Sequence, residues 1–140
     1  MIRKCPTCGT KNRIPAGRLD QQATCGKCKT PISPMDTPIE IASVGMFEEL
    51  ITSSSIPVLV DFWAAWCGPC KAMASELAKL ARVEAGRVVV AKVDTESLPQ
   101  IAARFSIQGI PTMLLFREGR LVHRIVGAQP ASQVASQLGL

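Results

Sequence analysis

The stretch IPVLVDFWAAWCGPCK, residues 56–71, joins an apolar run to two cysteines that lie two residues apart. The run IPVLVDFWA is almost continuously apolar, which is typical of a strand buried on both faces of a sheet. After Cys70, apolar residues recur at steps of three and four as far as Ala81, and Gly86 follows. This spacing predicts an amphipathic helix that starts at the C-x2-C pair and ends near Gly86.

The rest of the chain after residue 38 alternates between strand and helix patterns. We expect strands in IEIA (39–42) and RVVVAKVD (87–94), and helices in GMFEELITSS (45–54), SLPQIAARFSI (97–107) and ASQVASQLGL (131–140). The segment PTMLLFREGRLVHRIVG (111–127) predicts a hairpin that turns at Glu118 and Gly119. Strand–helix–strand crossovers make parallel strands and a hairpin adds antiparallel ones. The sequence therefore predicts an α/β fold with a mixed central sheet and helices on both faces.

The central pair, Cys67 and Cys70, is predicted to lie at a helix N-terminus. Backbone N–H groups and the helix dipole favour an anion there, so we expect a lowered pKa for Cys67. Pro69 falls in the first helical turn, where proline is tolerated, and Cys70 is on the same face as Cys67. Such a pair can attack a disulfide, form a mixed disulfide and resolve it. The alternatives are a pair of zinc ligands or two inert core cysteines.

Two further C-x2-C pairs lie in the first thirty residues, separated by sixteen residues. Their spacing fits a four-cysteine zinc site with one ion per chain, and the ligands would be Cys5, Cys8, Cys25 and Cys28. The alternative is two more redox pairs, but neither has a strand before it and a helix after it. The intervening TKNRIPAGRLDQQA contains too few apolar residues for a core, so we expect a metal to hold this segment together.

Three prolines in PISPMDTP (31–38) predict a semi-rigid linker between two parts of the chain. We therefore divide the sequence into a zinc-finger-like module at 1–30, a linker at 31–38 and a larger domain at 39–140. The thiolate ligands of the module would be sensitive to strong oxidants, which would release the zinc and unfold residues 1–30.

The chain carries a net charge of +5, and that charge is concentrated at one end. Residues 1–35 carry seven basic side chains against Asp20 alone, a balance of +6. This segment could attract nucleic acid, but it has no aromatic residue for base stacking, so we do not expect nucleic-acid binding. No apolar stretch is long enough to span a membrane and no secretory signal is visible, which favours the cytoplasm. We also expect a monomer.

The motifs VDFWAAWCGPCK and GIPTMLLFREG occur in the order and setting found in the thioredoxin family, which residues 38–140 resemble. A lowered cysteine pKa is well known in thioredoxins. The resemblance implies a thioredoxin fold and a general reductant of disulfide-containing target proteins, recharged by a flavin-dependent thioredoxin reductase and using no organic cofactor of its own. It also implies that Cys67 is the nucleophile and Cys70 the resolving cysteine. Bacterial thioredoxins with an N-terminal four-cysteine zinc module form a subfamily that this chain resembles.

The resemblance assigns further roles around the two thiols. Asp61 would exchange a proton with Cys70 and Lys92 would tune it, although an Asp61–Lys92 pair could also be purely structural. The bond before Pro111 would be cis, and the docking surface for targets would include Trp66, Gly109, Ile110, Thr112 and Gly127. In the family, Gly68 and Pro69 between the cysteines are typical of reductants, whereas oxidases and isomerases usually carry a histidine there.

One position departs from the family pattern. Ser75 stands where relatives usually have a proline that kinks the long helix. A serine can bond back to a helix carbonyl, and we expect Ser75 to bond to that of Lys71 and to leave a straighter helix.

Overall fold

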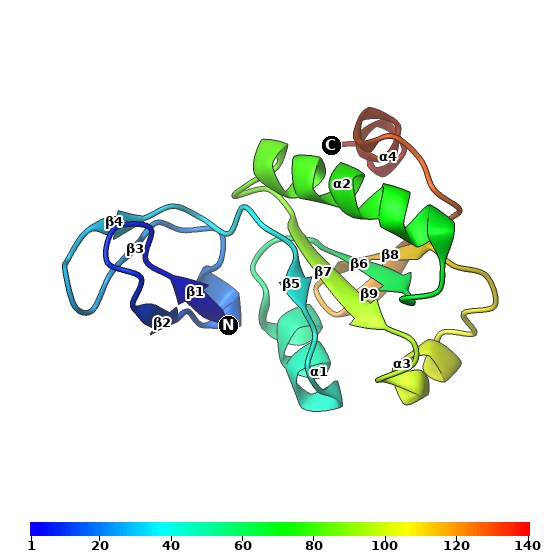
Figure 1. Ribbon diagram of the computed structural model, residues 1–140, viewed down its shortest axis with the longest axis horizontal. Coiled ribbons are helices and arrows are strands. Elements are labelled where there is room, and N and C mark those ends of the chain that lie inside the picture. The colour runs from blue at the N-terminus through cyan, green and yellow to red at the C-terminus, as the bar shows by residue number, and fades with distance from the viewer.

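The computed structural model describes all 140 residues, which form an N-terminal head and a larger body (Figure 1). The head contains β1 (Ile2–Lys4), β2 (Lys11–Arg13), the short 3-10 helix η1 (Ala16–Arg18), β3 (Ala23–Thr24) and β4 (Pro31–Ile32). The body contains β5 (Ile39–Glu40), α1 (Val44–Ser53), β6 (Val58–Trp63), α2 (Gly68–Val83), β7 (Val89–Asp94), α3 (Pro99–Arg104), β8 (Thr112–Arg117), β9 (Arg120–Val126) and α4 (Ala131–Leu138).

The body is built on one five-stranded sheet with the strand order β5-β7-β6-β8-β9. Strands β5, β7 and β6 run parallel to one another, and the β8–β9 hairpin adds two antiparallel strands beside β6. The predicted mixed sheet is therefore confirmed. Strand β6 is its central strand, so the segment that follows β6 leaves the sheet at its middle.

Helices cover both faces of the sheet, as predicted (Figure 1). Side chains alternate along β6, so Val60 and Phe62 pack toward α1 and α3 whereas Leu59 packs toward α2 and α4. Asp61 is two residues from Leu59 and therefore belongs to the α2 face. No helix has both the length and the apolar character that a membrane span requires.

The length of α3 and one hydrogen bond in α2 differ from the sequence predictions. Helix α3 has six residues and is shorter than expected, because Ser106 adopts a left-handed conformation with φ 54° just beyond it. Helix α2 runs uninterrupted for 16 residues through Ser75. Ser75 Oγ donates to the carbonyl oxygen of Ala72 at 3.1 Å, so the expected bond to Lys71 is wrong, because the hydroxyl reaches back three residues and not four.

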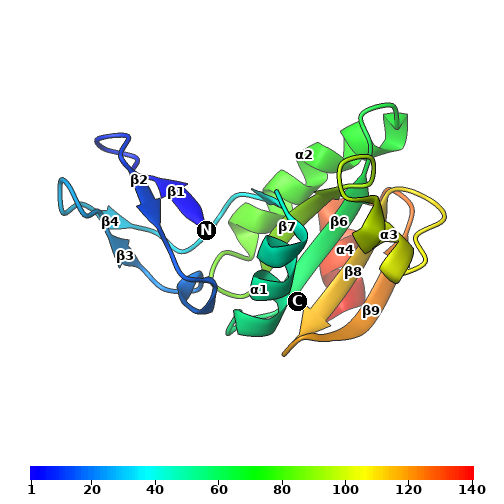
Figure 2. The same cartoon turned by 90° about the horizontal axis from the view of Figure 1, so that it is seen from below.

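The head consists of two small antiparallel hairpins whose tips point away from the body (Figure 2). Each hairpin turn holds one C-x2-C pair, between β1 and β2 and between β3 and β4. Pro31 and Ile32 pair with Thr24 and Ala23, so the second hairpin continues into the segment that we interpreted as a linker.

The head is docked on the body through the segment around η1. Ala16 and Leu19 are buried in the same apolar cluster as Phe47 and Leu50 of α1. The backbones approach closely here, because a Cβ built on Gly17 would lie 3.1 Å from a carbonyl oxygen of the α1 end. The head and the body therefore share part of one core, which the low apolar content of this segment did not suggest.

Candidate active site and metal site

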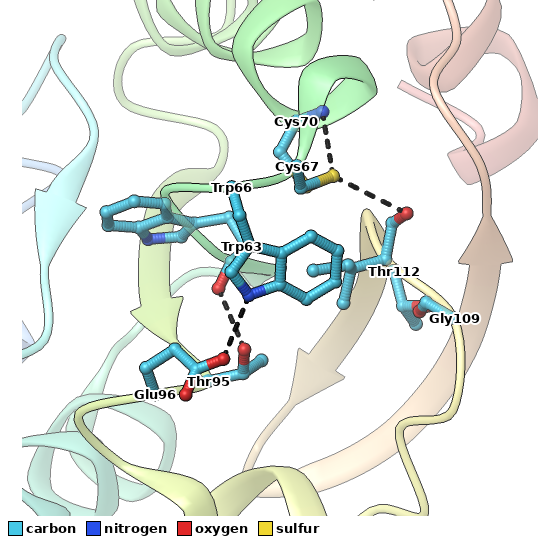
Figure 3. Close-up of a disulfide and its surroundings, with 9 residues drawn as sticks. Trp63, Trp66, Cys67, Cys70, Thr95, Glu96, Gly109 and Thr112 are labelled. Atoms are coloured by element: carbon cyan, nitrogen blue, oxygen red, sulfur yellow. Dashed lines mark hydrogen bonds between the residues drawn. A yellow bond between two sulfur atoms is a disulfide. The ribbon is translucent and has the colours of Figure 1, made fainter.

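The central cysteines form a disulfide at the point where β6 gives way to α2 (Figure 3). Cys67 is the N-cap residue of α2, and its Sγ accepts the backbone N–H of Cys70 at 3.2 Å. Pro69 occupies the first turn of α2. The N–H groups of that turn have no acceptor within the helix, so the N–H that proline lacks costs the helix no hydrogen bond. The residues are equally buried, at 4% exposure each, so exposure does not distinguish them. What distinguishes them is that Cys67 lies at the positive end of the helix dipole and Cys70 lies inside the helix.

The loop between α3 and β8 faces this disulfide. The Ile110–Pro111 peptide bond is cis, as the resemblance implies, and the Ile110 carbonyl oxygen lies 3.8 Å from Cys67 Sγ. The Thr112 hydroxyl donates to the carbonyl of Gly109, which closes the loop on itself. Gly127 donates its N–H to the Pro111 carbonyl at 2.8 Å and has φ +95°, a conformation that favours glycine. The structure thus brings the predicted loop residues together beside Cys67.

An exposed aromatic side chain borders the disulfide. Trp66 is 71% exposed, and its indole N–H donates to Glu96 Oε1 at 2.9 Å (Figure 3). Val126, next to the Gly127 turn, is also 62% exposed. Two large hydrophobic side chains near the disulfide are therefore exposed to solvent. Sequence reasoning missed Glu96, because nothing in its local pattern connects it to a tryptophan thirty residues earlier.

Asp61 is completely buried beneath α2, on β6. Neither of its carboxylate oxygens has a hydrogen-bond partner, and burial is the main reason why its pKa rises from 3.8 to about 7. Lys92 opposes this rise and Glu40 adds to it. Lys92 Nζ makes its ion pair with Glu40 Oε1, at 3.7 Å, and not with Asp61. A carboxyl group of this kind can hold or release a proton close to neutral pH.

The four cysteines of the head converge between the two hairpin tips. Their sulfur atoms all lie within 4.8 Å of one another, with Cys5 and Cys28 at 3.5 Å and Cys8 and Cys25 at 3.7 Å. A tetrahedral ion with metal–sulfur bonds of about 2.3 Å would hold its sulfur ligands roughly 3.8 Å apart. The cluster therefore has the size and donor set of a closed four-thiolate metal site.

The two hairpin turns repeat one geometry. In each turn the first cysteine donates its N–H to a threonine carbonyl five residues on, Cys5 to Thr10 and Cys25 to Thr30. In each turn the sulfur of the first cysteine accepts the N–H of the residue two further on, at 3.4 Å. In Cys25, the N–H groups of Cys28 and Lys27 lower the thiol pKa to about 6. Backbone donors thus stabilise the Cys25 thiolate, the form in which cysteine binds a metal.

Comparisons with known proteins match two segments of the chain. The profile of the thioredoxin family matches residues 38–139, and a profile described as the N-terminal part of thioredoxin 2 matches residues 4–30. Thioredoxin C-3 of Corynebacterium nephridii is 43% identical over 128 residues, which cover 91% of this chain and 86% of that protein. A solved structure of a Malassezia sympodialis thioredoxin has a TM-score of 0.67 at 32% identity, covering 77% of this chain and 93% of that one.

One further relative combines two proteins in one chain. The bifunctional thioredoxin reductase/thioredoxin of Mycobacterium leprae is 45% identical over 91 residues, which cover 65% of this chain and 20% of that protein. Fold, disulfide and comparisons together define a thiol–disulfide oxidoreductase. The chain belongs to the thioredoxin family and carries the N-terminal module of the thioredoxin 2 type.

Proposed function

We propose that this protein is a general protein disulfide reductant that thioredoxin reductase recharges. The observation that carries the proposal is the Cys67–Cys70 disulfide at the start of α2, facing the Gly109–Thr112 loop. The exposed Trp66 beside it supports a protein as the substrate, because a broad apolar surface suits a polypeptide better than a small molecule.

The proposed reaction moves two electrons from the dithiol to the target. The Cys67 thiolate attacks a target disulfide, forms a mixed disulfide and releases one target thiolate. The Cys70 thiolate then attacks the Cys67 sulfur, which releases the second target thiolate and leaves the Cys67–Cys70 disulfide. Asp61 accepts the proton that Cys70 loses, and its raised pKa supports this role.

Recharging reverses the redox state of the pair. Thioredoxin reductase would return two electrons and restore both thiols. The Mycobacterium leprae relative, whose name joins a reductase to a thioredoxin, supports this partner. Gly68 and Pro69 in the turn support a reductant over an oxidase, because no histidine stands there to stabilise the Cys67 thiolate further.

The proposed occupant of the head is one zinc ion, held by Cys5, Cys8, Cys25 and Cys28. The close-packed sulfur cluster supports a soft-ligand metal, and the closed set of four protein ligands supports a structural role over a catalytic one. The ion would hold the two hairpins together, and oxidation of its thiolates would release it.

Two measurements test the proposal. The reduction potential of Cys67–Cys70 should lie below the glutathione poise of about −220 to −260 mV, and a value well above it would indicate an oxidant. Cys70→Ser should accumulate a mixed disulfide with target proteins, and Cys67→Ser should not. The reverse trapping pattern would show that the two roles are exchanged.

A further inference from the structure

Three charged side chains form a row across the parallel part of the sheet. Lys92 on β7 is in register with Glu40 on β5 and with Asp61 on β6. Residues in register on neighbouring parallel strands point to the same face, so all three lie on the α2 side. One ammonium group therefore stands between two carboxyl groups, and it can neutralise only one of them fully.

The structure pairs the ammonium with the outer carboxylate. Lys92 Nζ lies 3.7 Å from Glu40 Oε1, and it sits over the ring of Trp63 at 5.0 Å from the centroid. The Glu40 carboxylate and the Trp63 ring both attract the cation. The two oxygens of Asp61, by contrast, are buried and have no hydrogen-bond partner. A lone buried carboxyl with a lysine one strand away needs an explanation, because pairing with that lysine would stabilise its charge.

We propose that Glu40 is a positioning residue for the proton exchange at Cys70, because it holds the Lys92 ammonium away from Asp61 and leaves Asp61 free to hold a proton. The inference rests on the proton role of Asp61 under the proposed function. Glu40 itself touches no reacting atom, and it acts through Lys92.

The groups around Asp61 give the expected change a definite sign. From β5 it meets Glu40, and from β7 Lys92, while Asp94 acts on Glu40 in turn. The buried α2 side chains on this face include Cys70, Met73 and Leu77, and the only ionisable group among them, the Cys70 thiol, is tied up in the disulfide of the oxidised protein. Burial raises the pKa of Asp61 most, Lys92 lowers it and Glu40 raises it. Removing the Glu40 charge would therefore end a repulsion and release Lys92 toward Asp61, and both changes lower the pKa of Asp61.

The first experiment follows the Asp61 carboxyl carbon by NMR as pH is varied in the oxidised protein, where Cys67 and Cys70 do not titrate. In Glu40→Gln the midpoint should fall by roughly one pH unit, the lower end of what a neighbouring opposite charge produces. Glu49→Gln is the matched control, because Glu49 is exposed on α1 at the opposite face and its loss changes the net charge equally. Equal midpoints in the Glu40 and Glu49 variants would overturn the proposal.

A double-mutant cycle then tests whether Glu40 acts through Lys92. In a Lys92→Gln background, Glu40→Gln should shift the Asp61 midpoint by less than half of its effect in the parent protein. A full effect in that background would mean that Glu40 acts only by its own charge, and the positioning role would be wrong.

The final arm measures how fast Cys70 resolves a mixed disulfide on Cys67 as a function of pH. We expect the Glu40→Gln profile to move to lower pH with the NMR midpoint and the Asp61→Asn profile to lose that step. If Asp61→Asn keeps the parent profile, the proton role in the proposed function fails. If Asp61→Asn loses the step but Glu40→Gln shifts neither midpoint nor profile, only the inference about Glu40 fails.

Discussion

The central cysteine pair and the two outer pairs share the C-x2-C spacing but stand in different surroundings. Cys67 follows a six-residue strand and caps a 16-residue helix, whereas Cys5 and Cys25 lie in turns between strands of two or three residues. The first sulfur of the central pair accepts a backbone N–H, as do those of the outer pairs. A backbone N–H donor to the first sulfur is therefore common to all three pairs and does not decide their chemistry.

What differs is the group that each pair faces. The outer pairs face each other, with cross-pair sulfur distances of 3.5 and 3.7 Å. The central pair faces a loop carbonyl and the surface bordered by Trp66. A thiolate opposite three other thiolates is arranged for a metal, and a cysteine beside an exposed apolar surface suits the proposed reaction with a target disulfide.

The largest expected effect comes from removing one sulfur from each kind of pair. Cys67→Ser should abolish disulfide reduction, to the rate without protein, and leave one metal ion per chain. Cys25→Ser should remove the metal and leave most of the reduction rate, because no step of the proposed reaction uses the head. Turnover and metal content measured on both variants check this. If Cys25→Ser were also inactive, the two kinds of pair would not be separable.

Metal removal should have the next largest effect, and it acts on the head. Structural zinc contributes about 10–16 kcal/mol to small four-ligand modules, more than two short hairpins can supply without it. A chelator or hypochlorous acid should therefore unfold the hairpin turns, measured by amide hydrogen exchange alongside zinc release.

The contact between the η1 segment of the head and α1 of the body predicts which part of the head should resist unfolding. Ala16 and Leu19 pack in the core of the body, so their neighbours should keep more exchange protection than the turns at Cys5 and Cys25. Zinc release was predicted to unfold residues 1–30, but the shared core divides the head into a part packed on the body and a part held only by the metal. Uniform loss of protection over residues 1–30 would contradict this view.

The third prediction concerns Asp61, whose pKa rises from 3.8 to about 7 on folding. The folded protein keeps a proton that the unfolded chain releases, so stability falls as pH rises between about 4 and 7. Asp61→Asn should remove this loss and raise the free energy of unfolding above pH 7 by up to about 4 kcal/mol. The gain should disappear below about pH 4. Denaturant unfolding across this range measures it, with Glu49→Gln as the control that should show no such trend.

The sequence was sufficient for the features that depend on local pattern. The apolar run before Cys67 and the periodic residues after it predicted β6 and α2, and the motif around Pro111 implied the cis bond. The four outer cysteines were grouped by their spacing alone, and they converge as that grouping requires.

The features that the sequence did not predict depend on contacts between distant segments. Leu19 buries itself by packing on α1, so the apolar content of its own segment says little about it. The Lys92 ion pair with Glu40 depends on the lateral order of β5, β7 and β6, which no local pattern contains. The family resemblance links Lys92 to Asp61, but the sequence does not show which carboxylate forms the ion pair with Lys92.

The smallest expected effect tests how closely the two outer turns match. Gly9 and Lys29 occupy equivalent positions, four residues after Cys5 and Cys25, and both have left-handed backbones with φ +75° and +65°. A left-handed conformation costs a residue with a Cβ roughly 1–2 kcal/mol, and glycine avoids that cost but loses more entropy on folding. Lys29→Gly should therefore stabilise the metal-loaded protein by about 1 kcal/mol in denaturant unfolding.

The reciprocal change provides the control for this last prediction. Gly9→Lys should destabilise the head by a similar amount, because no atom lies within 4 Å of a Cβ at Gly9 and only the backbone conformation opposes it. Lys29→Ala separates the backbone effect from the loss of the exposed Lys29 Nζ bond to the Gly26 carbonyl, since alanine removes the bond and keeps the strain. If Lys29→Gly and Lys29→Ala had the same stability, the left-handed turn would not be the cause. The two outer pairs would then resemble each other in spacing and ligands but not in the energetics of their turns.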